Sequence, residues 1–412
     1  MQSFIQSREC NIISPLRFKY ALNERMYAQM SWSTNRDQPY PIFPRVHTGA
    51  VNSLSVDSAE NRFLLSGGAD SSIRIWDLEE NVPSLSIGNE MGFNSMSCVA
   101  TIPRREGHKF GVSAVEWWPC DNGLFVSSSF DNTLRVWDTN TLQSAYRFDL
   151  KSKIYGFSIT MTGSHSLVAT AADHPMIRLL DLRTTSSAQT LIGHTGKVLS
   201  IAWSPVDPYC LATGGSDGTV RIWDIRQNNA CVTSLDYMQR TSKATNTPLK
   251  SRKAHLGAVN GLCWFPTGKT LISSGNDEKI RLWDLNDECS GPTGSGISGR
   301  NMLVNFGPHI RNRHLQNLTP CLSPVGDLVF PYLFYPSDNG EVFIFQTEDG
   351  KVVKRLSDTI NTPRCVSIVS RGNGSLIYYT GDMNGDIKTL KPELARPELV
   401  EEVAPGDDSD DD

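Results

Sequence analysis

The sequence contains no long hydrophobic run and no secretory leader pattern. Its longest apolar stretch, LVFPYLFYP at 328–336, is too short and too often broken by proline to cross a bilayer. The first ten residues, MQSFIQSREC, lack the apolar core of a signal peptide. These two absences predict a protein that is neither secreted nor membrane-spanning.

Paired cysteines and an excess of positive charge are also missing. The nine cysteines are scattered from Cys10 to Cys365 without a CxxC pair, which disfavours a disulfide framework and predicts a reducing, intracellular compartment. The net charge of −5 comes partly from an acidic tail, DDSDDD at 407–412, so a strongly basic nucleic-acid binder is disfavoured. With 39% hydrophobic residues the chain can bury a large core, and disorder is expected only locally.

What the chain does contain is an internal repeat. Four segments each carry a histidine, then a serine or threonine, then an aspartate and finally a Trp-Asp pair. The histidine precedes the tryptophan by 29 residues in three segments and by 28 in the fourth, a regularity that chance does not produce four times. The repeated residues are His47, Ser66, Asp70 and Trp76; His108, Ser127, Asp131 and Trp137; His194, Thr213, Asp217 and Trp223; and His255, Ser273, Asp277 and Trp283.

Within each repeat, the residues alternate with a period of two and turn signals separate the runs, which predicts short antiparallel strands. Three weaker units, at 153–181, 318–345 and 363–390, bring the total to seven. Seven such units close into a ring that leaves few exposed strand edges, so the pattern predicts a seven-bladed β-propeller. The segment IFPRV at 42–46 is expected to complete the last blade.

The recurring His, Ser and Asp have the composition of a hydrolase triad, but four copies serve no single catalytic centre. The repeat instead resembles the WD40 repeat, in which these residues form a buried hydrogen-bonded row. The resemblance implies an all-β, seven-bladed WD40 β-propeller over 41–392, with a helical extension over 1–40 and a disordered acidic tail over 393–412. It implies a binding protein that is not an enzyme and needs no cofactor.

Two other patterns fit a site less well. The stretch 268–270, Gly-Lys-Thr, resembles the end of a phosphate-binding loop, but six residues separate it from Gly261 where the motif needs four, so a hairpin turn is predicted. One possible set of metal ligands has a spacing that matches no compact zinc pattern, so no metal is expected. That set is Cys289, His309, His314 and Cys321.

A pair of arginines points to partner binding. Arg226 follows Trp223-Asp224, and Arg183 follows Leu180-Asp181 in the preceding unit, so adjacent blades are expected to present them on one face. Two guanidinium groups suit carboxylates or carbonyls of a partner. Residues 15–30 are predicted to form an amphipathic helix with Leu16 and Tyr20 near one side, suited to a partner groove; the alternative is a frayed terminus.

The arginine pair resembles the WDxR motif of receptors that dock on the damage-specific DNA-binding protein 1 adaptor of cullin-4 RING ubiquitin ligases. The runs SSSFDNTLRVWDTNTLQSA at 127–145, SPLRF near the N-terminus and GLCWFPTG in the fifth unit resemble the Cockayne syndrome A family of such receptors. This resemblance extends from about Ser14 to Pro392, and the chain departs from the family at 236–254, at 291–300 and in the sixth blade.

The resemblance implies a nuclear substrate-recognition subunit that acts in transcription-coupled nucleotide excision repair. Its implied partners are the adaptor with its cullin-4 ligase, a Cockayne syndrome B-type translocase and stalled RNA polymerase II, with no membrane. Its implied adaptor contacts are Arg183, Arg226, Leu16 and Tyr20. The alternative is a nuclear WD40 scaffold outside any ligase.

Several exposed segments are further candidates for partner contact, and direct DNA contact stays open. Two insertions, 79–107 and 236–254, exceed ordinary blade connections. Basic clusters fall in segments between the blades, where recognition residues of a rigid scaffold concentrate, although most such clusters are solvated loops. The clusters are Arg104 and Arg105; Lys250, Arg252 and Lys253; and Arg311 and Arg313.

Overall fold

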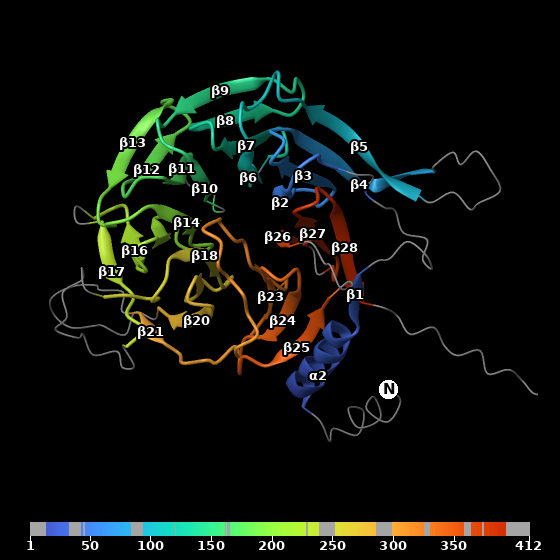
Figure 1. Ribbon diagram of the computed structural model, residues 1–412, viewed down its shortest axis with the longest axis vertical. Helices are drawn as coiled ribbons and strands as arrows, with labels where there is room; N and C mark the ends of the chain where they lie inside the picture. Colours follow the sequence, from blue (N-terminus) through green and yellow to red (C-terminus); the bar gives the residue numbers. More distant parts are fainter. Residues whose placement is uncertain are drawn as a thin grey trace, which may run out of the picture.

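The alternating runs of the sequence form short strands that pair with their neighbours along the chain. In the computed structural model these strands make seven four-stranded antiparallel sheets, the blades, arranged in a closed ring (Figure 1). The seven-bladed propeller predicted from the repeat is therefore confirmed, including the three weaker units. The structure describes residues 14–32, 43, 46–83, 94–119, 121–160, 162, 165–227, 230–238, 252–285, 299–324, 330–357, 364–372 and 375–392.

The blades are numbered in chain order. Blade 1 consists of β2 (Val51–Val56), β3 (Phe63–Gly68), β4 (Ile73–Pro83) and β5 (Asn94–Ile102). Blade 2 consists of β6 (Val112–Trp117), β7 (Leu124–Ser129), β8 (Thr133–Asp138) and β9 (Ser144–Asp149). Blade 3 consists of β10 (Ile154–Ile159), β11 (Leu167–Ala172), β12 (Ile177–Asp181) and β13 (Ser186–Leu191). Blade 4 consists of β14 (Val198–Trp203), β15 (Cys210–Gly215), β16 (Val220–Asp224) and β17 (Cys231–Ser234).

The last three blades follow the same order from the centre outward. Blade 5 consists of β18 (Val259–Trp264), β19 (Thr270–Gly275), β20 (Lys279–Asp284) and β21 (Arg300–Asn301). Blade 6 consists of β22 (Cys321–Leu322), β23 (Tyr332–Pro336), β24 (Val342–Gln346) and β25 (Val352–Leu356). Blade 7 consists of β26 (Cys365–Ser370), β27 (Tyr378–Asp382) and β28 (Ile387–Pro392), and β1 (Met30–Trp32) completes it.

The core lies between the blades. Every residue of β15 is buried, because its two faces pack against neighbouring blades, whereas the outermost strand β9 is mostly exposed. The four repeated tryptophans are at most 1% exposed. Blades 3, 6 and 7 place Leu180, Phe345 and Leu390 at the corresponding register, also at most 1% exposed. Large apolar side chains at this position therefore stabilise every blade.

The ring closes through β1, which pairs antiparallel with β28, so that Trp32 lies opposite Leu390. The prediction that 42–46 completes the last blade is wrong. Phe43 lies outside the strands and is buried, with its ring 5.3 Å from that of Trp76. The segment also contains Pro44, which has no N–H to donate to a sheet ladder. Phe43 therefore serves as a packing residue beside the seam.

The predicted N-terminal helix is present as α2 (Pro15–Ala28), the helix found in the described part of the chain. Ser14 caps it by accepting a hydrogen bond from the backbone N–H of Arg17 at 3.4 Å, and proline occupies its first turn. The helix lies on the outer rim of the ring beside β25 and β28 (Figure 1). Tyr27 is 2% exposed and packs against Tyr332, which anchors the helix to the propeller.

Candidate functional site

Each blade that begins with a repeated histidine holds it in a buried row. In blade 1, His47 Nε2 lies 3.0 Å from Ser66 Oγ, and Trp76 Nε1 donates to the same oxygen at 3.1 Å. His47 Nδ1 lies 3.1 Å from a carboxylate oxygen of Asp70. The same contacts join His108, Ser127, Asp131 and Trp137; His194, Thr213, Asp217 and Trp223; and His255, Ser273, Asp277 and Trp283.

The hydrogen bonds of the row in blade 2 agree with a neutral His108. Ser127 Oγ accepts from Trp137 Nε1 at 2.7 Å, and a neutral ring with its proton on Nδ1 accepts from Ser127 at Nε2, also at 2.7 Å. The Nδ1–H then donates to Asp131. Burial lowers the pKa of His108 and outweighs the opposing effect of Asp131, in agreement with a neutral ring near pH 7.

The aspartates of the rows remain ionised. Burial acts to raise the pKa of Asp131, but hydrogen bonds from His108 and Thr133 outweigh it and hold this pKa well below its usual range. Ser127 is fully buried and its proton is committed to His108. The row therefore exposes no nucleophile, and it satisfies polar groups that the fold must bury. The pKa values of Asp70, Asp217 and Asp277 are lowered in the same way.

The histidines and aspartates of the rows lie at one end of the strands, and the predicted arginine pair lies at the other. The histidine comes before the first strand of a blade and the aspartate before the third, and these two strands of an antiparallel blade begin at the same end. Arg183 and Arg226 follow the third strands β12 and β16, so both lie at the other end. Blades 3 and 4 are adjacent in the ring, and they present these two arginines on the same face.

Arg226 is held in place by the aspartate of its Trp-Asp pair. Its Nε and Nη2 donate to the two carboxylate oxygens of Asp224 at 2.9 Å each, and Nη2 reaches Asp207 at 3.3 Å. The guanidinium lies over the ring of Tyr209, 4.9 Å from its centroid. The side chain is still 54% exposed. The arrangement orients a cationic group that remains open to a partner.

Arg183 occupies the corresponding turn of blade 3 and is exposed. Its backbone N–H and the hydroxyl of Ser166 both donate to Asp181 at 2.9 Å, so this carboxylate supports the turn. A register shift precedes the turn in both blades, at Leu179/Leu180 in blade 3 and at Ile222/Trp223 in blade 4. Leucine in place of tryptophan therefore leaves the turn in the same position.

The sequence analysis did not predict three residues that lie beside the arginines on this face, namely His165, Asp207 and Tyr209. His165 donates to the Pro208 carbonyl at 2.7 Å, which joins the first turn of blade 3 to that of blade 4. Its ring lies 5.9 Å from that of Tyr209, the aromatic under Arg226. The sequence around Asp207 and Tyr209, SPVDPY at 204–209, predicts a turn but gives no indication of a contact with Arg226. We call the surface formed by these residues the arginine face; it consists of Arg183, Arg226, His165, Asp207 and Tyr209.

The two helix residues predicted to contact a partner lie away from these turns. Tyr20 is half-buried against the core beneath α2, and its hydroxyl accepts from the backbone N–H of Phe330 at 3.4 Å. This contact directs Tyr20 toward the propeller. The side chain of Leu16 lies outside the described residues.

Other segments singled out in the sequence have ordinary structural explanations. Gly268, with φ of 69°, makes a hairpin turn between β18 and β19, as predicted in place of a phosphate loop. In the described part of 79–107, β4 and β5 form a long hairpin that reaches Pro83 and Asn94. Most of 236–254 lies outside the described residues.

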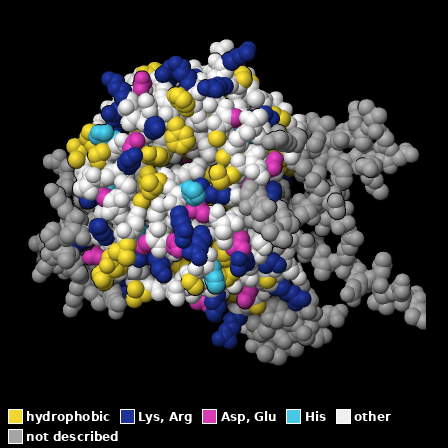
Figure 2. Space-filling model, in the orientation of Figure 1, with side chains coloured by type: hydrophobic (Ala, Val, Ile, Leu, Met, Phe, Trp, Pro, Cys, Tyr) yellow, Lys and Arg dark blue, Asp and Glu magenta, His cyan; other side chains and the backbone are white. Residues whose placement is uncertain are grey.

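The basic clusters do not form one surface. Arg104 and Arg105 are exposed in a turn, while Arg311 and Arg313 pair with Glu278 at 3.1 and 3.0 Å. Lys253 is exposed, Arg252 is half-buried and Lys250 lies outside the described residues. On the face shown in Figure 2, lysine and arginine side chains are interspersed with acidic and hydrophobic ones. A continuous basic surface for nucleic acid does not form there.

Neither a metal centre nor a membrane segment emerges from the described residues. Within them, no three His, Cys, Asp or Glu side chains gather as metal ligands. Cys289, one member of the set considered from the sequence, lies outside them. The described helix is too short and too polar to span a membrane.

Comparison with known proteins agrees with the repeat and the ring. The WD domain, G-beta repeat family matches 41–77, 96–138, 185–224 and 246–284, which contain the four histidine rows. WD repeat-containing protein ATCSA-1 of Arabidopsis thaliana is 31% identical over 371 aligned residues, which cover 74% of this chain and 78% of that protein. The chain belongs to the WD40-repeat family. The resemblance to the Cockayne syndrome A family is confirmed at this level.

Other similar proteins match a smaller part of the chain and have other names. Radiation-sensitive protein 28 of Saccharomyces cerevisiae is 28% identical over 267 residues, 60% of this chain and 51% of that protein. Ribosome biogenesis protein ytm1 of Aspergillus oryzae is 32% identical over 262 residues, 57% of this chain and 53% of that protein. The chain spans about half the length of these two relatives.

Proposed function

We propose that this WD40 propeller is a nuclear substrate-recognition subunit of a cullin-4 RING ubiquitin ligase that acts in transcription-coupled nucleotide excision repair. The chain itself catalyses no reaction, and ubiquitin transfer belongs to the other ligase subunits. The arginine face docks on the damage-specific DNA-binding protein 1 adaptor, with Leu16 of α2 as a further contact. Tyr20, predicted as a second contact on this helix, instead packs on the propeller. The ligase then receives a Cockayne syndrome B-type translocase or proteins of stalled RNA polymerase II.

The presentation of Arg226 is the observation that supports the proposal. Its carboxylate clamp, Asp224 and Asp207, fixes the guanidinium in one orientation, so little side-chain entropy is lost when a partner binds. More than half of the side chain is exposed, and Arg183 occupies the equivalent turn one blade away. The similarity to ATCSA-1 supports the resemblance to the Cockayne syndrome A family from which the proposal starts.

The test measures binding of the purified full chain to the purified adaptor. Arg183→Ala/Arg226→Ala is expected to weaken binding by at least about tenfold, or ~1.4 kcal/mol, because both exposed cations of the face are lost. Leu16→Asp should also weaken binding if α2 enters a groove of the adaptor. The measurement is biolayer interferometry, supported by affinity capture from cells with mass spectrometry.

Arg104→Ala/Arg105→Ala is the matched control. These arginines are exposed as well, but they follow β5 at the end of blade 1 that carries the histidine rows. The control should bind the adaptor like wild type. Equal binding by all the variants, with the fold intact by circular dichroism, would remove the arginine face from the proposal.

The second candidate function is a nuclear scaffold outside any ligase. The similarity to ribosome biogenesis protein ytm1, whose name refers to no ligase, supports this second candidate. It predicts that affinity capture of wild type yields no ligase subunit, and that the captured partners stay bound when Arg183 and Arg226 are replaced.

A further inference from the structure

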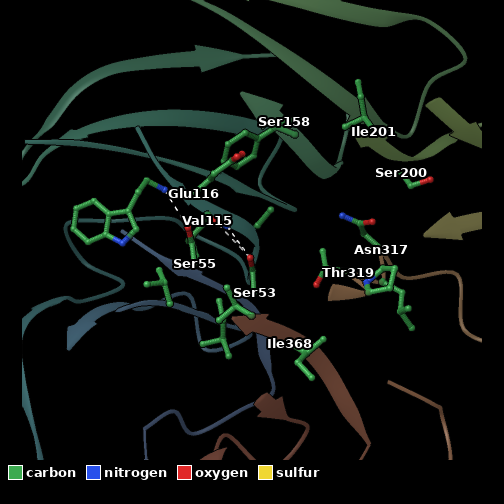
Figure 3. A pocket seen from close by; sticks show the side chains of 18 of the residues that line it. Ser53, Ser55, Val115, Glu116, Ser158, Ser200, Ile201, Asn317, Thr319 and Ile368 are labelled. Carbon is green, nitrogen blue, oxygen red and sulfur yellow. Dashed lines mark hydrogen bonds between the residues drawn. The ribbon is translucent and has the colours of Figure 1, made fainter. Parts of the chain in front are cut away.

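A cavity of about 400 Å³ occupies the centre of the ring (Figure 3). Its wall is formed by the innermost strands, and it extends to Ser58 and Pro119. Both residues lie in turns that follow an innermost strand, at the end of the strands that carries the arginine face. The cavity therefore has its mouth on that face.

The segment before blade 6 lines the opposite end of the cavity. Asn317 and Thr319 enter the cavity from this segment (Figure 3). Next to them, Gln316 donates to Asn52 Oδ1 of blade 1 at 3.1 Å and accepts from Arg364 Nη1 of blade 7 at 3.2 Å. These contacts connect the segment before blade 6 to blades 1 and 7 at this end of the cavity.

The wall combines apolar side chains and hydroxyl groups with one ionisable group. Glu116 of β6 is the ionisable side chain among the residues that line the cavity. Hydroxyl groups line the cavity from β2 and the turn after it, from β10, from β14 and from the segment before blade 6, and apolar side chains line it from several blades. The lining includes Ser53, Ser55, Ser158, Ser200, Ile201 and Ile368.

Glu116 holds the position in blade 2 that serine holds in blades 1 and 3. Ser55 of blade 1 accepts the backbone N–H of Trp117 in blade 2 at 3.3 Å, and Ser158 of blade 3 accepts that of Trp203 in blade 4 at 3.1 Å. Glu116 of blade 2 accepts the backbone N–H of Ile159 in blade 3. A serine is therefore sufficient for the structural contact. The glutamate adds length and an ionisable carboxyl group that this contact does not need.

No cation compensates Glu116 within the described residues. The influences on its carboxyl group are burial, which raises the pKa to about 8, and the opposing hydrogen bond from Ile159. A carboxyl group in this state is mostly protonated near pH 7. Isolated carboxyl groups with raised pKa values inside pockets are typical of ligand sites, and the cavity volume lies within the usual range of such sites.

We propose that the central cavity binds an alkylammonium group, with Glu116 as its counter-ion. The methylene stem packs on the apolar wall, and the ammonium group donates to Glu116 and to the serine hydroxyls beside it. Binding converts Glu116–COOH and R–NH₃⁺ into the pair Glu116–COO⁻···⁺H₃N–R, and one proton passes to the solvent. The group belongs either to a lysine of a protein docked on the arginine face or to a free diamine. The proposal does not rest on the ligase function.

Calorimetry with two probes tests the proposal on the full chain. The probes are the pentapeptide Ac-Gly-Gly-Lys-Gly-Gly-NH₂ and 1,5-diaminopentane, and the matched control is the same peptide with norleucine, which keeps the stem but lacks the charge. We expect at least one ammonium probe to bind, with an affinity about tenfold weaker in Glu116→Gln. Titrations in two buffers of different ionisation enthalpy should show proton release near pH 7, and affinity should increase from pH 6 to 8.

Each outcome decides the proposal or the source of the ligand. Binding by the peptide alone identifies a partner lysine, and binding by the diamine alone identifies a free amine. If Glu116→Gln does not fold, Glu116→Ser replaces it, since serine holds this position in blades 1 and 3. No binding of either probe at millimolar concentration, equal binding of the norleucine peptide, or unchanged binding by the Glu116 variants would overturn the proposal.

Discussion

Ser66, Ser127, Thr213 and Ser273 each connect a tryptophan to a histidine inside a blade. A hydroxyl group is the smallest side-chain group that accepts from the indole and donates to the imidazole at once. Blade 3 has leucine in place of tryptophan, and there the corresponding Thr170 donates to the Arg178 carbonyl at 3.0 Å. The polar residue of a row is therefore determined by the partners that the blade must satisfy.

The raised pKa of Glu116 predicts that its contribution to stability decreases as pH rises, whereas the contribution of a carboxyl group with a lowered pKa increases. Its folded-state pKa, about 8, lies above its ordinary value of 4.5, so the stability that it contributes is fully present below pH 4.5 and is lost as pH rises through 8. Glu116→Gln stays neutral. The variant should gain free energy of unfolding relative to wild type between pH 5 and 8, by at most about 1.4 kcal/mol per pH unit.

Urea denaturation of wild type and Glu116→Gln at several pH values measures this difference directly. The comparison between the two proteins cancels the contributions of the histidine rows, which are identical in both. A difference that stays constant from pH 5 to 8 would contradict a raised pKa for Glu116.

At the scale of elements, the three-residue strand β1 has a larger role than its length indicates. It pairs with β28 and supplies the fourth strand of blade 7, so blade 7 combines residues from both ends of the propeller. Met30 is fully buried in one core cluster with Tyr27 of α2 and Tyr332 of blade 6. Helix and strand therefore anchor the seam together.

Met30→Ala should destabilise the protein by about 2–5 kcal/mol, the usual cost of a truncated and fully buried side chain. Met238→Ala is the matched control, because Met238 is 65% exposed and its truncation should change stability by less than about 0.5 kcal/mol. Chemical denaturation measures both. Similar stabilities of the two variants would mean that β1 contributes little to the seam.

At the scale of the whole molecule, closure of the ring buries the faces of the blades. Each blade packs against two neighbours, and β1 gives the last blade the four strands that the other six have. The closed ring also creates two distinct faces and one central cavity, none of which exists in a single blade. The arginine face and the position of Glu116 both depend on closure.

Deletion of residues 1–32 should open the ring, because it removes β1 and exposes the edge of β28, a template for pairing with another chain. We expect a lower thermal midpoint and self-association by size-exclusion chromatography with light scattering. Deletion of 1–13 is the control, since it leaves Ser14, α2 and β1 in place. A monomeric 33–412 protein with unchanged stability would contradict the sealing role of β1.

The sequence by itself determined the fold and the contents of the rows. The spacing of His47, Ser66, Asp70 and Trp76 is local to one blade, and its fourfold recurrence predicts both the strands and their buried contacts. The arginine turn could also be predicted, because Arg226 lies three residues beyond Trp223 in the same hairpin. Patterns of this kind act within about thirty residues, where periodicity is readable.

Only the tertiary structure decided the seam, the neighbours of Arg226 and the environment of Glu116. Met30 and Leu390 are far apart in sequence, so no local pattern distinguishes 30–32 from 42–46 as the closing strand. Tyr209 and His165 meet through turns of two blades, and Glu116 of blade 2 faces the same cavity as Ser55 of blade 1 but carries an ionisable carboxyl group. These features arise from contacts between blades, which form when the ring closes and which strand periodicity does not encode.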